Sequence, residues 1–290
     1  MAALRTPLPG GRWHFQHGPM DLVIGAEGQA SALADAHAAA WHRFEPLLDE
    51  LVAELALLRA PVRAGCRLQG TVARRMWRAC APYRAGFITP MAAVAGAVSQ
   101  ELIGCYRRVG IARAWVNNGG DIALHLTPGQ SLRIGLYADL ARLDAAQLRA
   151  GLAIDGRFEV RHAMPVRGVA TSGWRGRSFS LGIADSVTVL AASAAQADAA
   201  ATVIANAVDV AGDPRIVRRP ACELKDDSDL GDLPVTVDVP PLDTPTLRRA
   251  LAAGAQVARD LQTRGLIHAC ALVCQGLMMN TLPATEAIAA

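Results

Sequence analysis

The sequence lacks several features that mark whole classes of protein. Aromatic residues make up only 4% of its 290 residues, the formal net charge is only +3, and lysine and arginine form no block. Nucleic-acid binding usually needs a concentrated basic surface, so we expect no nucleic-acid partner. Every stretch of eighteen residues contains a charged or strongly polar side chain, so we expect no transmembrane helix and no membrane partner.

The N-terminus and the cysteines also lack familiar signals. Residues 1–11 contain one arginine, two prolines and two glycines but no apolar segment long enough for a signal peptide, which predicts a cytoplasmic protein. The six cysteines show neither a CxxC pair nor zinc-ligand spacing. Reduced and mostly buried thiols are therefore the interpretation that we adopt.

The sequence does contain enough apolar material for a substantial core, with 52% hydrophobic residues. We find no internal repeat and no linker long enough to separate two domains. We predict a single domain over residues 12–282, a disordered or extended segment over 1–11, and a frayed tail over 283–290.

Hydrophobic periodicity predicts an α+β fold, with mixed or antiparallel sheets flanked by helices. The expected strands cover residues 13–24, 112–116, 122–126, 131–138, 157–161, 185–190 and 265–279. The expected helices cover residues 29–60 with a break at Pro46, and 70–80, 87–110, 143–150, 194–208 and 244–262. We expect N-caps at Thr89, Ser193 and Thr244, and a polar, irregular segment over 220–241.

Asp198 and Thr202 stand four residues apart in the alanine-rich helix, which places both oxygens on one face. Two hard oxygen donors suit Mg²⁺ or Ca²⁺. The alternative is an aspartate on a solvated face and a threonine bonded to the carbonyl one turn earlier.

Small residues dominate the start of the helix expected over 87–110, so it can approach another backbone or a flat ligand closely. Its N-terminus, next to Thr89 and Met91, would attract phosphate through free N–H groups. The alternative is a tightly packed core helix.

Two glycine-containing loops add polar groups. Asn117, Asn118, Gly119, Gly120 and Asp121 form either a tight turn or a surface that reads the edge of a ring. In the second loop, Thr171, Ser172, Gly173 and Arg175 form either a hairpin turn or a phosphate cradle, in which Arg177 also takes part.

Together these segments resemble a known family. Gly119-Gly-Asp121, Val169-Ala-Thr-Ser-Gly173, Ser186-Val-Thr-Val-Leu190 and Ala197-Asp-Ala-Ala-Ala-Thr202 follow the order seen in the ApbE-like superfamily, whose best-known members are FAD:protein FMN transferases. Pro90-Met-Ala-Ala-Val-Ala-Gly96 and Asn117-Asn-Gly-Gly-Asp121 are similar to a short, poorly characterised cytoplasmic branch. The resemblance runs from about Trp13 to the last strand.

The resemblance implies a T-fold-related architecture, FAD or FMN as cofactor, and Mg²⁺. The metal would be held by Asp198, Thr202 and the main-chain carbonyl near Ala92, and the Asn117–Asp121 loop would face the flavin nucleotide. Two departures stand out. Ala95 occupies the position of a transferase lysine, and Ser178–Asp185 replaces a His-x-x-Asp-Pro-x-Thr-Gly segment.

Two functions stay open. The first is flavin-nucleotide binding with Mg²⁺-dependent cleavage of FAD or transfer of FMN; Asp121 and Asp185 are its catalytic candidates. The second is a superfamily member without transferase activity that binds another flat or phosphorylated ligand in a cofactor-biosynthesis pathway. We expect a nucleotide-like small molecule as partner, with a homodimer as an open alternative, and all these segments lining one cleft.

Overall fold

The computed structural model describes residues 2–136, 156–176 and 178–281. The chain forms two compact units. The first contains Met1–Leu132, Val160–Ala170 and Ala191–Ala199, and the second contains Arg133–Glu159, Thr171–Leu190 and Ala200–Ala290. Strand β8 (Gly168–Ser172) and helix α7 (Ala194–Ala207) each begin in the first unit and end in the second.

The strands of the first unit form an antiparallel ladder. In spatial order they are β1 (Leu4–Leu8), β2 (Arg12–His17), β3 (Met20–Gly28), β4 (Ile111–Asn118) and β5 (Asp121–Leu126), and β5 pairs with the first residues of β8. The predicted strands from β2 to β5 are confirmed. Strand β1 lies in the segment that was expected to be disordered or extended; Pro7 is tolerated there because β1 has a partner on one side only.

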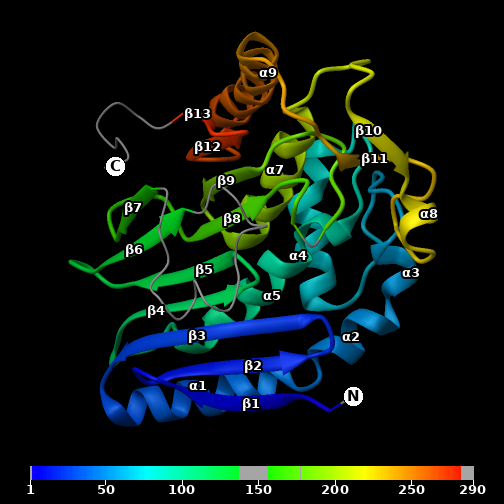
Figure 1. Ribbon diagram of the computed structural model, residues 1–290. Helices are drawn as coiled ribbons and strands as arrows, with labels where there is room; N and C mark the ends of the chain where they lie inside the picture. Colours follow the sequence, from blue (N-terminus) through cyan, green and yellow to red (C-terminus); the bar gives the residue numbers. More distant parts are fainter. Residues whose placement is uncertain (1, 137–155, 177, 282–290) are drawn as a thin grey trace. The chain divides into compact units, whose positions relative to one another are not determined.

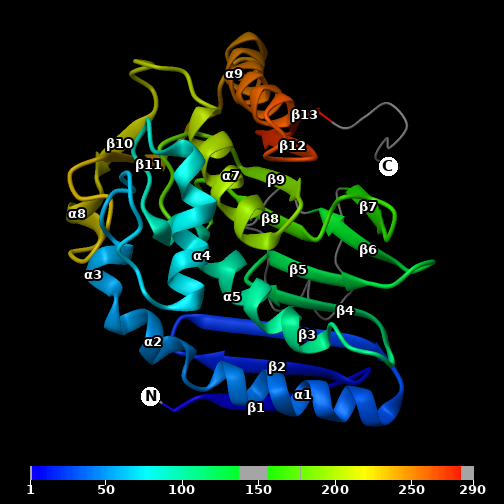
Figure 2. The same ribbon diagram turned by 180° about the vertical axis from the view of Figure 1, so that it is seen from behind.

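Helices cover one face of this ladder. Figures 1 and 2 show α1 (Ala30–Phe44) and α5 (Val94–Ile103) on the same face of β1 to β5. Alternate strand residues point toward them, and Phe15 of β2 packs its ring against Trp41 and Phe44 of α1. The core of the unit therefore lies between the strands and these helices.

The helical region after β3 breaks at Pro46, as predicted. Helix α1 ends at Phe44, and α2 (Leu47–Ala53) begins after the proline, followed by α3 (Leu55–Leu58) and α4 (Thr71–Cys80). Arg75 on α4 pairs with Glu101 of α5 at 2.7 Å, and Glu101 also accepts from Arg43 at 2.8 Å.

The single helix predicted over residues 87–110 is wrong in detail. The chain forms a 3₁₀ turn, η2 (Pro90–Ala93), then α5, then a second 3₁₀ turn, η3 (Gly104–Tyr106); a further turn, η1 (Ala81–Tyr83), follows α4. Thr89 precedes η2 rather than an α-helix, and its side chain does not cap that turn. The proline fits the first position of the turn because it needs no N–H donor there.

The second unit contains another antiparallel group of strands. In spatial order they are β9 (Ser186–Ala191), β12 (Ala269–Cys274) and β13 (Leu277–Asn280), and α9 (Thr244–Thr263) packs on β12 and β13 (Figure 1). The single closing strand predicted over 265–279 is wrong. A two-residue turn at Gln275 and Gly276, with φ of 46° and 80°, divides it into a hairpin.

Two further predictions for this unit need correction. The N-cap of α9 is Asp243, whose carboxylate accepts from the Thr246 N–H at 2.9 Å, and not Thr244. The segment 220–241 is not irregular throughout: β10 (Val217–Pro220) pairs with β11 (Pro234–Asp238), and α8 (Ala221–Leu224) lies between them in the chain.

Helices and antiparallel strands together confirm the α+β class. Strands β6 (Ser131–Leu136) and β7 (Gly156–Arg161) pair with each other where strands were predicted. The predicted helix over 143–150 and the predicted tail lie outside the described residues. Within the described ranges, no helix combines the length and the apolar character that crossing a membrane requires. The single-domain boundaries stay a prediction.

Gly168 offers a test of the packing between β8 and α7. A Cβ added at this position would lie 2.1 Å from the backbone of Ser193 and Ala194. We expect Gly168→Ala to lower the free energy of unfolding by about 1–3 kcal/mol, because overpacking against backbone has no rotamer solution. Chemical denaturation measures the change.

Gly104 provides the matched control, since a Cβ added there meets no atom within 4 Å. Gly104→Ala should leave stability unchanged or raise it by at most about 1 kcal/mol. Equal stability of the Gly168→Ala protein and the wild type would contradict the close approach of β8 and α7.

Candidate functional site

Asp198 caps a neighbouring helix. Its Oδ2 accepts a hydrogen bond from the Gly96 N–H at 2.9 Å. Gly96 lies in the first turn of α5, whose own N-cap residue, Ala93, has no side-chain acceptor. The carboxylate of α7 therefore supplies the cap that α5 lacks, and the alternative of an aspartate on a solvated face is wrong. The Gly96 N–H is already used and does not offer itself to a phosphate.

The start of α7 follows the prediction. Ser193 Oγ accepts from the Gln196 N–H at 3.4 Å, which confirms Ser193 as the N-cap. A second acceptor was not foreseen: Oε1 of Gln100, on α5, accepts from the Ala195 N–H at 3.2 Å. The polar run Ser99-Gln-Glu101, which follows small and apolar residues in α5, was the only available signal of such a role.

Burial changes the acidity of Asp198. Desolvation raises the pKa of its carboxyl from 3.8 to about 7, although hydrogen bonds from the Gly96 and Ala95 N–H groups act in the opposite direction. Asp198 as a whole residue is half-buried. Burial, and to a smaller extent the charge of Asp198, raises the pKa of the Cys80 thiol. An ionised Asp198 is thus costly unless a positive charge comes close.

The turn between β4 and β5 is held by its own residues. Gly119 and Gly120 have φ of 65° and 112°, which glycine adopts without strain. Asn117 Oδ1 accepts from the Gly120 N–H at 2.8 Å. The tight-turn alternative is confirmed for these three residues, and reading of a ring edge stays a prediction.

Asn118 and Asp121 connect the same hairpin to α5. Both side chains are buried. Asn118 Oδ1 accepts from the Asp21 N–H at 3.3 Å, and its Nδ2 donates to the Ala95 carbonyl at 3.4 Å. Ser99 Oγ donates to the Asp121 carbonyl at 2.9 Å. The first two turns of α5 therefore bring together three predicted site residues: Asn118, Asp121 and Asp198.

The other predicted residues of this region lie just before α5 or further along α7. Thr89 is buried, and its carbonyl accepts from the Ala92 N–H at 3.2 Å at the start of η2, where Met91 also lies. Thr202 follows Asp198 by one turn of α7 and is half-buried. Ala92 thus lies in a short 3₁₀ turn and Thr202 in the longer helix α7.

Thr171 and Ser172 are the last residues of β8, so their predicted position in a loop is wrong. The Thr171 hydroxyl bonds with the Thr188 hydroxyl of β9 at 2.9 Å. Gly173 is explained by close approach rather than by backbone freedom, because an added Cβ would lie 2.2 Å from the Asp185 carbonyl.

Arg175 is exposed, and its guanidinium has two neighbours. Its Nε lies 3.8 Å from Asp185 Oδ1, and its carbon centre lies 4.9 Å from the centre of the Trp174 ring. Asp185 is buried, and its Oδ2 accepts from the Gln275 N–H. The structure therefore brings Arg175 and Asp185 together, while Arg177 lies outside the described residues.

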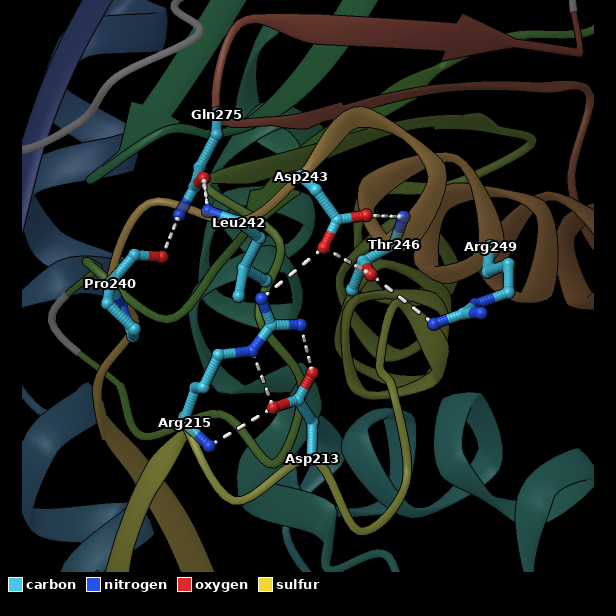
Figure 3. Close-up of polar contacts among 8 residues, drawn as sticks. All are labelled: Asp213, Arg215, Pro240, Leu242, Asp243, Thr246, Arg249 and Gln275. Carbon is cyan, nitrogen blue, oxygen red and sulfur yellow. Dashed lines mark hydrogen bonds and ion pairs between the residues drawn. The ribbon is translucent and has the colours of Figure 1, made fainter.

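Gln275 was not foreseen, and it holds two segments together. In Figure 3 its Oε1 accepts from the Leu242 N–H at 2.9 Å and its Nε2 donates to the Pro240 carbonyl at 2.8 Å. Asp243, the residue after Leu242, is bridged to Asp213 by the Arg215 guanidinium. Gln275 is the only non-glycine residue of positive φ among those described. The Gln-Gly pair inside an alternating stretch was the available signal.

Comparisons with known proteins cover nearly the whole chain. A family model described as "AbpE bacteria" matches residues 5–280. A UPF0280 protein of Methanopyrus kandleri is 37% identical over 220 residues, which are 73% of this chain and 80% of the relative. A UPF0280 protein of Methanospirillum hungatei is 35% identical over 134 residues, which span 46% of this chain and only 50% of the relative.

A solved structure shows the same fold. The crystal structure of the ApbE protein of Thermotoga maritima is similar with a TM-score of 0.52, over 96% of both chains. The two sequences are 12% identical, so this likeness concerns the fold alone.

The acidity of Asp198 predicts a pH dependence of stability. Its pKa is about 7 in the folded chain and near 3.8 when exposed. The folded chain thus binds this proton more tightly. The protonated Asp198 carboxyl therefore stabilises the folded chain, fully below pH ~4, and this contribution is lost as the pH rises through ~7. In Asp198→Asn, residue 198 cannot titrate. Without divalent cations, the free energy of unfolding of the wild type should therefore fall by more than about 1 kcal/mol relative to that of the variant between pH ~5 and ~8.

Urea denaturation of both proteins in EDTA across this pH range measures the difference. Parallel stability profiles of the two proteins would show that Asp198 has an ordinary pKa in the fold.

Proposed function

We propose that this chain, which belongs to the family described as AbpE bacteria, binds a flavin nucleotide and cleaves the pyrophosphate of FAD with Mg²⁺. The observation that carries the proposal is the state of Asp198. A carboxylate with a raised pKa, hydrogen-bonded through Oδ2 to the Gly96 N–H, is suited to a cation. The flavin part rests on the sequence resemblance.

The residues present fit a magnesium ion. The donors are hard oxygens: the Asp198 carboxylate, the Thr202 hydroxyl one turn later on α7, and the main-chain carbonyl near Ala92. Among the described residues, no group of three or more His, Cys, Asp or Glu side chains is arranged to hold a metal ion, so phosphate oxygens and water would complete the shell. When bound, Mg²⁺ supplies polarisation of a phosphoryl oxygen and neutralises charge on the pyrophosphate.

The chain's own polar groups have separate tasks. Arg175, oriented by Asp185 and Trp174, would donate to phosphate oxygens, as would the hydroxyls of Thr171 and Ser172. In the cleavage, the oxygen of water or of an acceptor hydroxyl forms a bond to the FMN phosphorus. The P–O bond to AMP breaks, and AMP leaves with the bridging oxygen.

The two catalytic candidates differ in their surroundings. Asp185 is engaged by Arg175 and by the Gln275 N–H, which suits a positioning role. Asp121 is buried beside α5 and stays the candidate that accepts the proton of the attacking oxygen.

A second function is favoured by Ala95, which stands where transferases of the superfamily have a lysine. Its carbonyl accepts from Asn118, and its N–H is bonded to Asp198. In this alternative the protein binds another flat or phosphorylated ligand in a cofactor-biosynthesis pathway, without transfer.

The cytoplasmic location, the nucleotide-like partner and the homodimer stay predictions.

AMP release separates the two functions. The purified protein with FAD and Mg²⁺ should release AMP, detected by chromatography, and EDTA should stop the release. Asp198→Asn should lower the rate at least ~100-fold, because one charged ligand is lost. A folded wild type that binds FAD tightly but releases no AMP would support the second function and exclude the first.

Arg175→Ala tests the phosphate contact. We expect it to weaken FAD binding by about 10- to 100-fold, because a charge-assisted hydrogen bond contributes about 1.5–3 kcal/mol. Titration of flavin fluorescence measures the affinity. Arg248→Ala, which removes an exposed arginine of α9 in the same unit, should leave it unchanged. Equal affinities of the two variants would rule out Arg175 as a ligand contact.

A further inference from the structure

Helices α5 and α7 cap each other. Asp198 of α7 accepts from the Gly96 N–H in the first turn of α5, at 2.9 Å. Gln100 of α5 accepts from the Ala195 N–H in the first turn of α7, at 3.2 Å. Each side chain thus accepts from an N–H group at the start of the other helix. Such N–H groups are usually bonded by an N-cap residue that directly precedes their own helix.

The two bonds fix the helices against each other. On α5 the bonded residues, Gly96 and Gln100, are four apart, and on α7 Ala195 and Asp198 are three apart. Both spacings correspond to about one helical turn. Rotation or sliding of either helix would break at least one of the two bonds. The pair of bonds therefore sets the register between α5 and α7.

The helix backbones also touch at this point. A Cβ added at Gly96 would lie 2.4 Å from the Ala194 carbonyl and 2.9 Å from Cβ of Asp198. No larger residue fits without moving α7. The position of the Asp198 carboxylate thus depends on its hydrogen bonds from the Gly96 and Ala95 N–H groups, on the backbone contact at Gly96, and on the hydrogen bond by which Gln100 holds the start of α7.

This arrangement matters for a cation because its ligand must be held in orientation. Groups that do not touch a metal but orient its ligands change metal affinity about 10- to 100-fold when they are removed. Gln100 meets this description: it bonds to the α7 backbone three residues before Asp198 and lies on the helix that Asp198 caps.

We propose that Gln100 is a positioning residue, which holds Asp198 in the orientation that binds a divalent cation. The inference rests on the proposed function in one respect, that Asp198 is a cation ligand. It adds that the affinity of this site is set from α5, by a side chain that makes no contact with the metal.

Calorimetric titration of the full chain with Mg²⁺, and with Mn²⁺ as a second probe, tests the inference. Gln100→Met keeps the length of the side chain but removes the oxygen acceptor, so we expect the Kd for the cation to rise about 10- to 100-fold. Gln100→Glu keeps an acceptor and should bind within about threefold of the wild type. Gln256→Ala on α9, where Gln256 is exposed and bonded to Asp260, is the control and should bind as the wild type does.

The outcomes separate the inference from the proposed function. A wild type that binds neither cation overturns the assignment of Asp198 as a ligand, and the proposed function fails with it. A wild type that binds, with Gln100→Met binding equally well, overturns only the role of Gln100. A purely structural role would lower the melting temperature of Gln100→Met without changing its Kd, so both quantities are measured on each protein. If Gln100→Met does not fold, a wild-type Kd in the folded Gln100→Ala protein overturns the inference equally.

Discussion

The hydrogen bond between the Gly96 N–H and the Asp198 carboxylate is the contact on which the candidate site depends. It joins the start of α5 to the second turn of α7, and glycine is required because the two backbones approach so closely. The same turn of α5 receives Asn118 through the Ala95 carbonyl. Helix α5 therefore contacts and positions both the Asp198 carboxylate and the β4–β5 hairpin.

This contact has an electrostatic consequence. A carboxylate surrounded by protein loses hydration, and two backbone N–H groups do not compensate for that loss, so the pKa rises. A positive charge close to such a carboxylate stabilises its ionised form. The raised pKa and the proposed binding of a cation concern the same residue.

In the second unit, the contacts of one turn residue, Gln275, connect several segments. Gln275 sits in a turn with positive φ, which costs free energy for any residue other than glycine. Its main-chain N–H holds Asp185, and its side chain bonds to both Pro240 and Leu242. Three segments distant in sequence thus meet at one residue. Arg175 is oriented indirectly by this network, through its ion pair with Asp185.

The sequence by itself determined the fold class, most strands, the break at Pro46 and the cap at Ser193, because these depend on periodicity and on local backbone chemistry. It also carried the resemblance to the ApbE-like superfamily. It could not give the partner of Asp198, since a hydrogen bond to Gly96 joins residues about a hundred positions apart. The division of residues 265–279 into a hairpin, the position of Thr171 and Ser172 within a strand, and the roles of Gln100 and Gln275 were decided only in three dimensions. Each depends on which backbone groups come within hydrogen-bonding distance once the helices and strands have packed, and no local pattern records that distance.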